Sequence, residues 1–134
     1  MNPAILCVDD EKIVLDSLQE QLESHFGDSF TYEIAESVDE ALEVIADLED
    51  DGCNLVLVIS DWLMPRVKGD VFLVNLHASK PEVIKVMLTG QADPEAVQNA
   101  MDNADLFAYV KKPWREADLM TRLESALRDK KLIK

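Results

Sequence analysis

Apolar runs alternate along this chain with segments in which apolar residues recur at helical spacing. The run at residues 55–59, Leu-Val-Leu-Val-Ile, has no polar interruption and is rich in β-branched residues. Such a run is typical of a strand buried on both faces, as in a parallel sheet covered by helices on each side. Four further strands are predicted at residues 5–8, 30–35, 83–88 and 106–110.

Helices are predicted between and after these strands. A capping box at residues 37–40 opens the second helix, and Asp93 followed by Pro94 marks the start of the fourth. The predicted helices cover about residues 13–26, 37–50, 70–79, 93 onward and 115–130. The apolar residues that recur at helical spacing are Ile13, Val14, Leu18, Leu22 and Phe26 in the first helix. Those expected to face the core elsewhere are Ala41, Leu42, Ile45, Leu48, Leu119, Leu123, Ala126 and Leu127, with Met87, Met101 and Met120 as core filler.

Strands and helices that alternate in this order are the pattern of a doubly wound α/β fold. Because crossovers between neighbouring strands are right-handed, the strands are expected to be parallel. We therefore predict one domain over residues 1–134, in which five helices cover a five-stranded parallel sheet.

Charge narrows the range of partners. The chain has 27 acidic and 13 basic residues, a formal net charge of −14. Nucleic acids and anionic membranes bind through clustered Lys and Arg, so neither is expected as a direct partner. An acidic chain suits a divalent cation or a basic partner surface. Cys7 and Cys53 form no disulfide framework, and no signal peptide or membrane span is visible, so a cytoplasmic setting is expected.

Polar side chains follow four of the predicted strands. Asp9 and Asp10 come after the first, Asp61 after the third, Thr89 ends the fourth, and Lys112 follows the fifth. Carboxyl ends of parallel strands meet at one edge of a sheet, where ligands bind. Three carboxylates there repel one another unless a cation lies among them, and oxygen ligands suit Mg²⁺. Considered alone, Asp61 is equally well interpreted as a reactive carboxylate or as a cap of the following turn.

Taken together, these motifs resemble those of the response-regulator receiver domain, the phosphoacceptor module of two-component signalling. The residues that carry the resemblance are Asp9-Asp10-Glu11, Asp61 with Met64-Pro65 and Gly69, Thr89-Gly90, Tyr109 and Lys112-Pro113. The resemblance covers essentially the whole chain. It implies a flavodoxin-like fold with the strand order 2-1-3-4-5.

The resemblance also implies a site chemistry. Asp61 would accept a phosphoryl group from a histidine kinase or a phosphotransfer protein. Asp10, Asp61 and the backbone carbonyl of Leu63 would ligate Mg²⁺, and Asp9 would support the ion through water. Lys112 would bond the phosphoryl group, and the peptide bond between this residue and Pro113 would be cis.

Switching is implied as well. Thr89 would move towards the phosphoryl group while Tyr109 turns inward, changing the surface of the fourth helix, fifth strand and fifth helix. The surface would control an output domain or effector protein that the sequence does not reveal, and a phosphorylation-dependent dimer is compatible with it. The protein is expected to be a stand-alone regulator or the first domain of a longer one.

Two other functions compete with this interpretation. Aspartyl-phosphate phosphatases carry a second Asp two residues after the nucleophile, where this chain has Leu63. An apolar side chain cannot orient water, so we expect a switch with a long-lived phosphoryl group, not a turnover enzyme. A docking module independent of phosphorylation usually loses an acidic or Lys position, and none is lost here. Trp62 is expected to shape access to Asp61, or to contact a partner.

Overall fold

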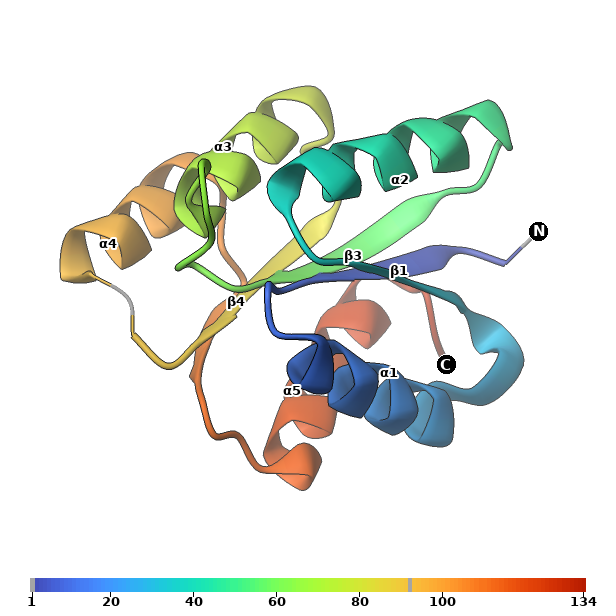
Figure 1. Ribbon diagram of the computed structural model, residues 1–134. Helices are drawn as coiled ribbons and strands as arrows, with labels where there is room; N and C mark the ends of the chain where they lie inside the picture. Colours follow the sequence, from blue (N-terminus) through green and yellow to red (C-terminus); the bar gives the residue numbers. More distant parts are fainter. Residues whose placement is uncertain (1, 92) are drawn as a thin grey trace.

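Five parallel strands form a single sheet in the order β2-β1-β3-β4-β5 (Figure 1). The computed structural model describes residues 2–91 and 93–134. The strands are β1 (Ala4–Val8), β2 (Thr31–Ala35), β3 (Leu55–Ser60), β4 (Ile84–Thr89) and β5 (Ala108–Lys111). The helices are α1 (Lys12–Phe26), α2 (Val38–Asp50), α3 (Gly69–Ser79), α4 (Pro94–Asn103) and α5 (Glu116–Asp129), with a short 3-10 turn at Gly27–Ser29. The predicted doubly wound, flavodoxin-like fold and its strand order are confirmed.

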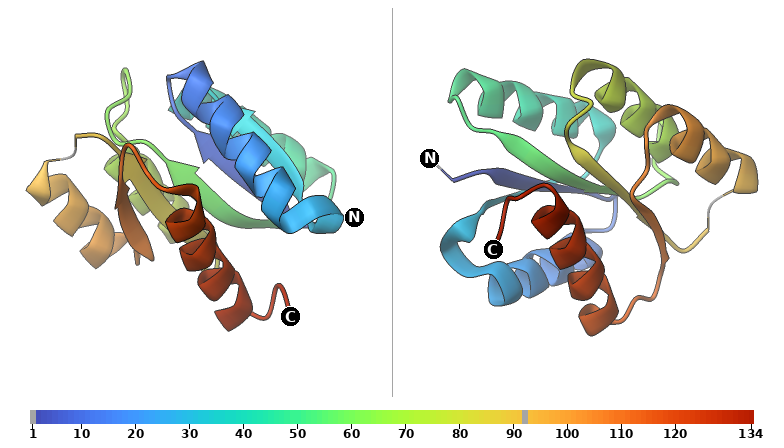
Figure 2. Two further views of the ribbon diagram at one scale, coloured as in Figure 1. Left: turned by 90° about the horizontal axis from the view of Figure 1, so that it is seen from below. Right: turned by 180° about the vertical axis from the view of Figure 1, so that it is seen from behind.

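The sheet is covered on both faces, as the aliphatic runs predicted. Helices α1 and α5 lie against one face, and α2, α3 and α4 lie against the other (Figures 1 and 2). Every residue of β1, β3 and β4 is buried. Burial of apolar area on two faces is the main stabilising contribution to such a sheet. The second helix begins as predicted, because the Ser37 hydroxyl accepts a hydrogen bond from the Glu40 N–H at 3.1 Å.

Three side chains of the predicted apolar sets lie outside the core. Leu42 is 53% exposed, Met101 is 48% exposed and Ile13 is 77% exposed. The expectations that Leu42 faces inward and that Met101 fills the core are therefore wrong. Leu42 and Met101 are each one step, about 100° of helical rotation, from the buried stripe of their own helix, whereas Ile13 lies two residues before Leu15, on the opposite face of α1. In α4 the buried positions are the small residues Ala96 and Ala100, which let the helix lie close to its neighbours and leave Met101 at the surface.

The strand order places the site. The chain adds β2 on one side of β1 and then β3, β4 and β5 on the other side, so the strand order reverses at β1. Such a switch point opens a crevice beyond the carboxyl ends of the central strands. The polar residues that follow β1 and β3 are therefore delivered to one place. Across residues 2–91 and 93–134, no helix is both long and apolar enough to cross a membrane.

Candidate functional site

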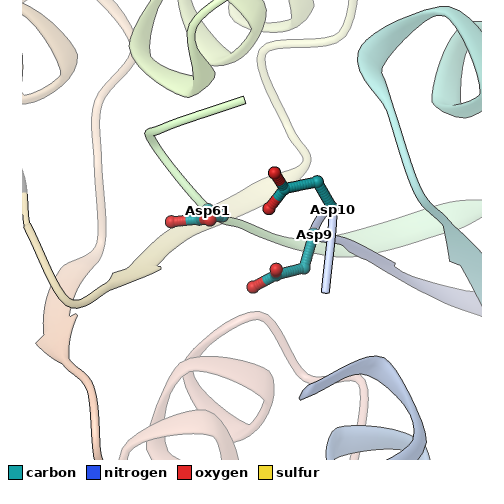
Figure 3. A group of neighbouring side chains, drawn as sticks. All are labelled: Asp9, Asp10 and Asp61. Atoms are coloured by element: carbon teal, nitrogen blue, oxygen red, sulfur yellow. The ribbon is translucent and has the colours of Figure 1, made fainter. Parts of the chain in front are cut away.

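Three carboxylates meet beyond the ends of β1 and β3. Val8 pairs with Ser60 in the sheet, so the residues that follow them, Asp9 and Asp61, emerge side by side. The Asp61 N–H donates to the Val8 carbonyl at 2.9 Å, which extends this pairing past the strand end. One carboxylate oxygen from each of Asp9, Asp10 and Asp61 lies within 4.8 Å of the other two, and Figure 3 shows the three side chains. The predicted convergence of these residues is confirmed.

The backbone holds two of these carboxylates in place. Asp61 is 5% exposed, and its Oδ1 accepts a hydrogen bond from the Trp62 N–H at 2.8 Å. Asp9 is also buried, and its Oδ1 accepts from the Glu11 N–H at 2.9 Å. Asp10, in contrast, is exposed. The cluster therefore has two fixed members and one that faces solvent.

Lys112 supplies a positive charge to this cluster. Its Nζ lies 2.6 Å from Asp9 Oδ2, 3.5 Å from Asp61 Oδ2 and 3.6 Å from Glu11 Oε1. Burial by itself lowers the pKa of Lys112, but the hydrogen bond to Asp9 and the surrounding carboxylates outweigh burial, so the pKa lies above its ordinary value. Its peptide bond to Pro113 is cis, as predicted.

Asp9 remains an unfavourable place for a negative charge. Burial raises the pKa of Asp9 above its ordinary value, and the negative charge of Asp61 acts in the same direction. Hydrogen bonds from Lys112 and from the Glu11 N–H lower this pKa without offsetting burial. The charged form of Asp9 is therefore disfavoured, chiefly by burial, in spite of its bond to Lys112.

An open hollow of about 480 Å³ lies over these groups. Thr89 lines it from the end of β4, as predicted, and its buried hydroxyl accepts from the Gln91 N–H at 3.4 Å. Leu63 lines the hollow with an exposed side chain, two residues beyond Asp61. The full lining consists of Asp10, Glu11, Asp61, Leu63, Thr89, Gly90, Gln91 and Lys112. The hollow is large enough for a small charged group such as a phosphoryl group.

Gly69 allows the loop after β3 to fold back beside the site. A Cβ atom built on Gly69 would overlap the carbonyl oxygen of Asp61 and lie 2.9 Å from the Trp62 Cα. The Gly69 N–H donates to the Trp62 carbonyl at 2.8 Å. Only glycine fits this approach, because the contact is with backbone that cannot move aside independently of Asp61.

Tyr109, also in the predicted set, lies away from this hollow. Its side chain is half-buried and packs against the core beneath α2, α3 and α4. It lines a separate hollow between β5 and α5, together with Trp114 and Arg122. The predicted role of Tyr109 as a switch remains a prediction.

Asp70 belongs to the surroundings of the site, although the sequence indicated only that it starts a helix. Its Oδ1 accepts from the indole Nε1–H of Trp62 at 2.9 Å, and its Oδ2 accepts from Asn99 Nδ2 at 2.9 Å. The only sequence signal is an acid in the first turn of a largely apolar helix, which ordinarily indicates favourable placement near the helix N-terminus. No spacing rule connects it to Trp62 or to Asn99.

The carboxylate cluster fits a hard divalent cation. It offers only oxygen ligands, has one member open to solvent, and concentrates more negative charge than Lys112 balances. Mg²⁺ favours a small number of carboxylates and retains water molecules in its coordination shell. Asp9, Asp10 and Asp61 are therefore suited to hold such an ion.

Comparisons with known proteins place this chain in a family and agree with its fold. Residues 5–124 match the family described as the response regulator receiver domain. The hydrogenase transcriptional regulatory protein HoxA of Cupriavidus necator is 25% identical over 92% of this chain and 24% of its own length. The sensor kinase CckA of Brucella abortus is 28% identical over 92% of this chain and 12% of its own length. The chain thus spans a quarter or less of these curated relatives.

Among solved structures, the signal receiver domain of an HD domain-containing protein from Pseudomonas fluorescens Pf-5 has a TM-score of 0.84 and 28% identity. The alignment covers 96% of this chain and 97% of that domain. Since the family match extends over most of the chain and the fold agrees with it, this protein belongs to the response regulator receiver domain family, the phosphoacceptor switches of two-component signalling.

Proposed function

We propose that Asp61 is the phosphoacceptor of this receiver domain. The observation that carries the proposal is its position: a buried carboxylate at the end of β3, with Lys112 Nζ 3.5 Å from its Oδ2 and two further carboxylates within 4.8 Å. In the transfer from a phosphohistidine, an Asp61 oxygen forms a bond to phosphorus. The bond from phosphorus to the donor's imidazole nitrogen breaks, and that nitrogen leaves with the electron pair.

Asp10, Asp61 and the backbone carbonyl of Leu63 are proposed to ligate Mg²⁺, with Asp9 supporting it through water. A bound Mg²⁺ ion would neutralise the repulsion among the carboxylates and part of the charge on the phosphoryl oxygens. The excess of negative charge in the cluster and the raised pKa of Asp9 support this assignment.

Lys112 and Thr89 are proposed to bind the phosphoryl group. Lys112 would move from its bond with Asp9 to a phosphoryl oxygen, and the Thr89 hydroxyl would donate to another. The response would reach the surface of α4, β5 and α5, with Tyr109 turning inward as part of the change. Support for this route comes from Thr89, which ends β4 at the hollow, and from Tyr109 on the adjacent strand.

Residues 1–134 are proposed to act as one cytoplasmic receiver domain that is not a turnover enzyme. The donor would be a histidine kinase or phosphotransfer protein, and the output would be a separate effector or a domain attached to the receiver. Its relatives include parts of a transcriptional regulator and of a sensor kinase. A phosphorylation-dependent dimer would be compatible with this function, and neither nucleic acid nor membrane is proposed as a direct ligand of this domain.

Neither a phosphorylation-independent docking module nor an aspartyl-phosphate phosphatase is favoured. The acidic and Lys positions of the resemblance are all present and lie together. The position two residues beyond Asp61 is Leu63, whose side chain can neither give nor take a proton.

The test is incubation with a small phosphodonor, with and without Mg²⁺, followed by intact-mass measurement. We expect one added phosphoryl group that requires both Mg²⁺ and Asp61, and no addition to Asp61→Asn. The matched control is Asp93→Asn, because asparagine also caps a helix and Asp93 caps α4. Equal phosphorylation of Asp61→Asn would exclude Asp61 as the acceptor.

A further inference from the structure

Asp70 joins three parts of the structure through its two oxygen atoms. It lies in the first turn of α3 and is 8% exposed. Its Oδ1 accepts from the indole N–H of Trp62, in the loop after β3, at 2.9 Å. Its Oδ2 accepts from the side-chain amide of Asn99, in α4, at 2.9 Å. A single carboxylate therefore links the loop that carries Asp61 to α4.

In the part of the chain that the structure describes, the side chains that donate to the Asp70 carboxylate are neutral. Within residues 2–91 and 93–134, it forms no ion pair within 4.0 Å with a Lys, Arg or His side chain. Its charge is stabilised by the N-terminus of α3 and by the two neutral donors. Because a buried carboxylate that loses a donor is costly, Asp70 holds Trp62 and Asn99 in defined orientations.

Trp62 connects this carboxylate to Asp61. Its backbone N–H donates to Asp61 Oδ1 at 2.8 Å, while its indole N–H donates to Asp70. The Trp62 carbonyl is also occupied, accepting from the Gly69 N–H at 2.8 Å. Movement of the Trp62 backbone is therefore tied to the indole ring, and movement of the ring is tied to Asp70.

Asn99 extends the connection along α4. Its Oδ1 accepts from Asn103 Nδ2 at 2.8 Å, while its own amide donates to Asp70. The amide of Asn99 is consequently fixed at both ends, so it cannot turn over without breaking one of these bonds. Asp61, Trp62, Asp70 and Asn99 form one continuous hydrogen-bonded series between the carboxylate cluster and α4.

We infer that Asp70 is a positioning residue, which aims the Trp62 N–H at Asp61 and couples the state of Asp61 to α4. The inference rests on the proposed function, in which Asp61 accepts the phosphoryl group. Phosphorylation converts the Asp61 carboxylate into an acyl phosphate, which makes its carboxyl oxygens weaker acceptors and brings phosphoryl oxygens close to the Trp62 N–H. The resulting shift of Trp62 moves its indole, and through Asp70 it biases the position of Asn99. This route is separate from the one proposed through Thr89 and Tyr109.

Two variants distinguish the hydrogen bonds of Asp70 and Trp62 from the packing of their side chains. Asp70→Asn keeps the volume of the side chain but has only one acceptor oxygen, so one of the two donors faces an amide. Trp62→Phe removes the indole N–H and keeps an aromatic ring. The matched controls are Trp114→Phe, which removes the other indole N–H, bonded to Gln21, and Gln98→Ala, which removes an amide–carboxylate bond on the exposed face of α4.

The measurement is the ¹H–¹⁵N spectrum before and after addition of beryllofluoride with Mg²⁺, a stable mimic of the phosphoryl group. The two tryptophans give two indole signals, and Trp114→Phe assigns the one from Trp62. In the native sequence we expect beryllofluoride to shift the indole signal of Trp62 and the side-chain amide signals of Asn99. In Asp70→Asn and in Trp62→Phe, the Asn99 signals should no longer respond, while beryllofluoride still binds with an affinity lowered by about tenfold or less. Both controls should respond like the native sequence.

Other outcomes distinguish the two hypotheses. If the native protein binds beryllofluoride but its Asn99 signals do not move, or if they move equally in Asp70→Asn and Trp62→Phe, the coupling is overturned and the proposed function stands. If the native protein neither binds beryllofluoride nor gains a phosphoryl group, both are overturned. Should Asp70→Asn fail to fold, the Trp62→Phe variant decides the question alone.

Discussion

The ammonium group of Lys112 donates to Asp9, with 2.6 Å between Nζ and Oδ2. These residues follow β5 and β1, which are separated in the sheet by β3 and β4. The pair therefore closes the site across two intervening strands. The Lys112 ammonium, which is proposed to bind the phosphoryl group, is therefore bonded to Asp9 in this structure. Its distance to Asp61 Oδ2 is longer than its distance to Asp9, at 3.5 Å.

Replacement of Asp9 by Asn should stabilise the protein in the absence of Mg²⁺ at neutral pH, by about 1 kcal/mol. The folded-state pKa of Asp9 is raised above its ordinary value of 3.8, chiefly by burial. Between these two pKa values the folded state binds more protons than the unfolded state, so the stability of the native sequence falls as pH rises through this window. The advantage of Asp9→Asn should thus be largest above the folded pKa and vanish below pH 3.8. Denaturant unfolding in a pH series with a chelator measures it, and a constant difference at all pH values would contradict the assignment to Asp9.

Replacement of Lys112 by Met should slow phosphorylation of Asp61 by about a hundredfold, the size of effect seen when a preorganised charge-stabilising donor is lost. Because the pKa of Lys112 is raised above its ordinary value of 10.5, this residue stays charged at neutral pH, and loss of its proton should not slow the native reaction at any pH below 10.5. Initial rates of mass gain from a small phosphodonor measure the effect. Lys111→Met is the matched control, because Lys111 is the adjacent, exposed lysine and should be replaceable without loss.

Replacement of Gly69 by Ala should destabilise the fold by about 3 kcal/mol, because the new Cβ overlaps the Asp61 carbonyl and the backbone must shift. Gly90→Ala, also beside the site, is the control. Its Cβ would meet only Lys112 Cβ, at 3.8 Å, an ordinary contact, so a change within about 0.5 kcal/mol is expected. Thermal and denaturant unfolding compare the two. Similar stabilities for both variants would show that the loop relaxes without cost.

Replacement of Leu63 by Asn should shorten the lifetime of the phosphoryl group by about tenfold, because a polar side chain at the hollow can orient an attacking water. Leu42→Asn changes an exposed leucine in the groove between α2 and α3 and should leave the lifetime unchanged. The decay of phosphorylated protein is followed by intact mass after the donor is removed. A native phosphoryl group that disappears within seconds in Mg²⁺ buffer would contradict the expected long-lived state.

Much of the architecture follows from local patterns in the chain. Uninterrupted aliphatic runs predict strands buried on two faces, and their alternation with helical segments predicts a parallel doubly wound sheet. In such a sheet the carboxyl ends of the strands lie at one edge. The sequence therefore predicts that Asp9, Asp10, Asp61, Thr89 and Lys112 come together there. The wrong expectation that Leu42 faces the core also comes from local pattern. Helical periodicity gives the direction of the buried face of a helix but not the width of that face.

Only the tertiary structure decided which of these groups touch. The preference of Lys112 for Asp9 over Asp61 depends on a difference of less than one ångström between two contact distances, 2.6 Å to Asp9 Oδ2 and 3.5 Å to Asp61 Oδ2. The bonds from Trp62 and Asn99 to Asp70 depend on how a loop, α3 and α4 pack together. Sequence periodicity describes each element by itself, whereas these contacts arise from the twist of the sheet, the course of the loops and the close packing of side chains, which the whole chain determines together.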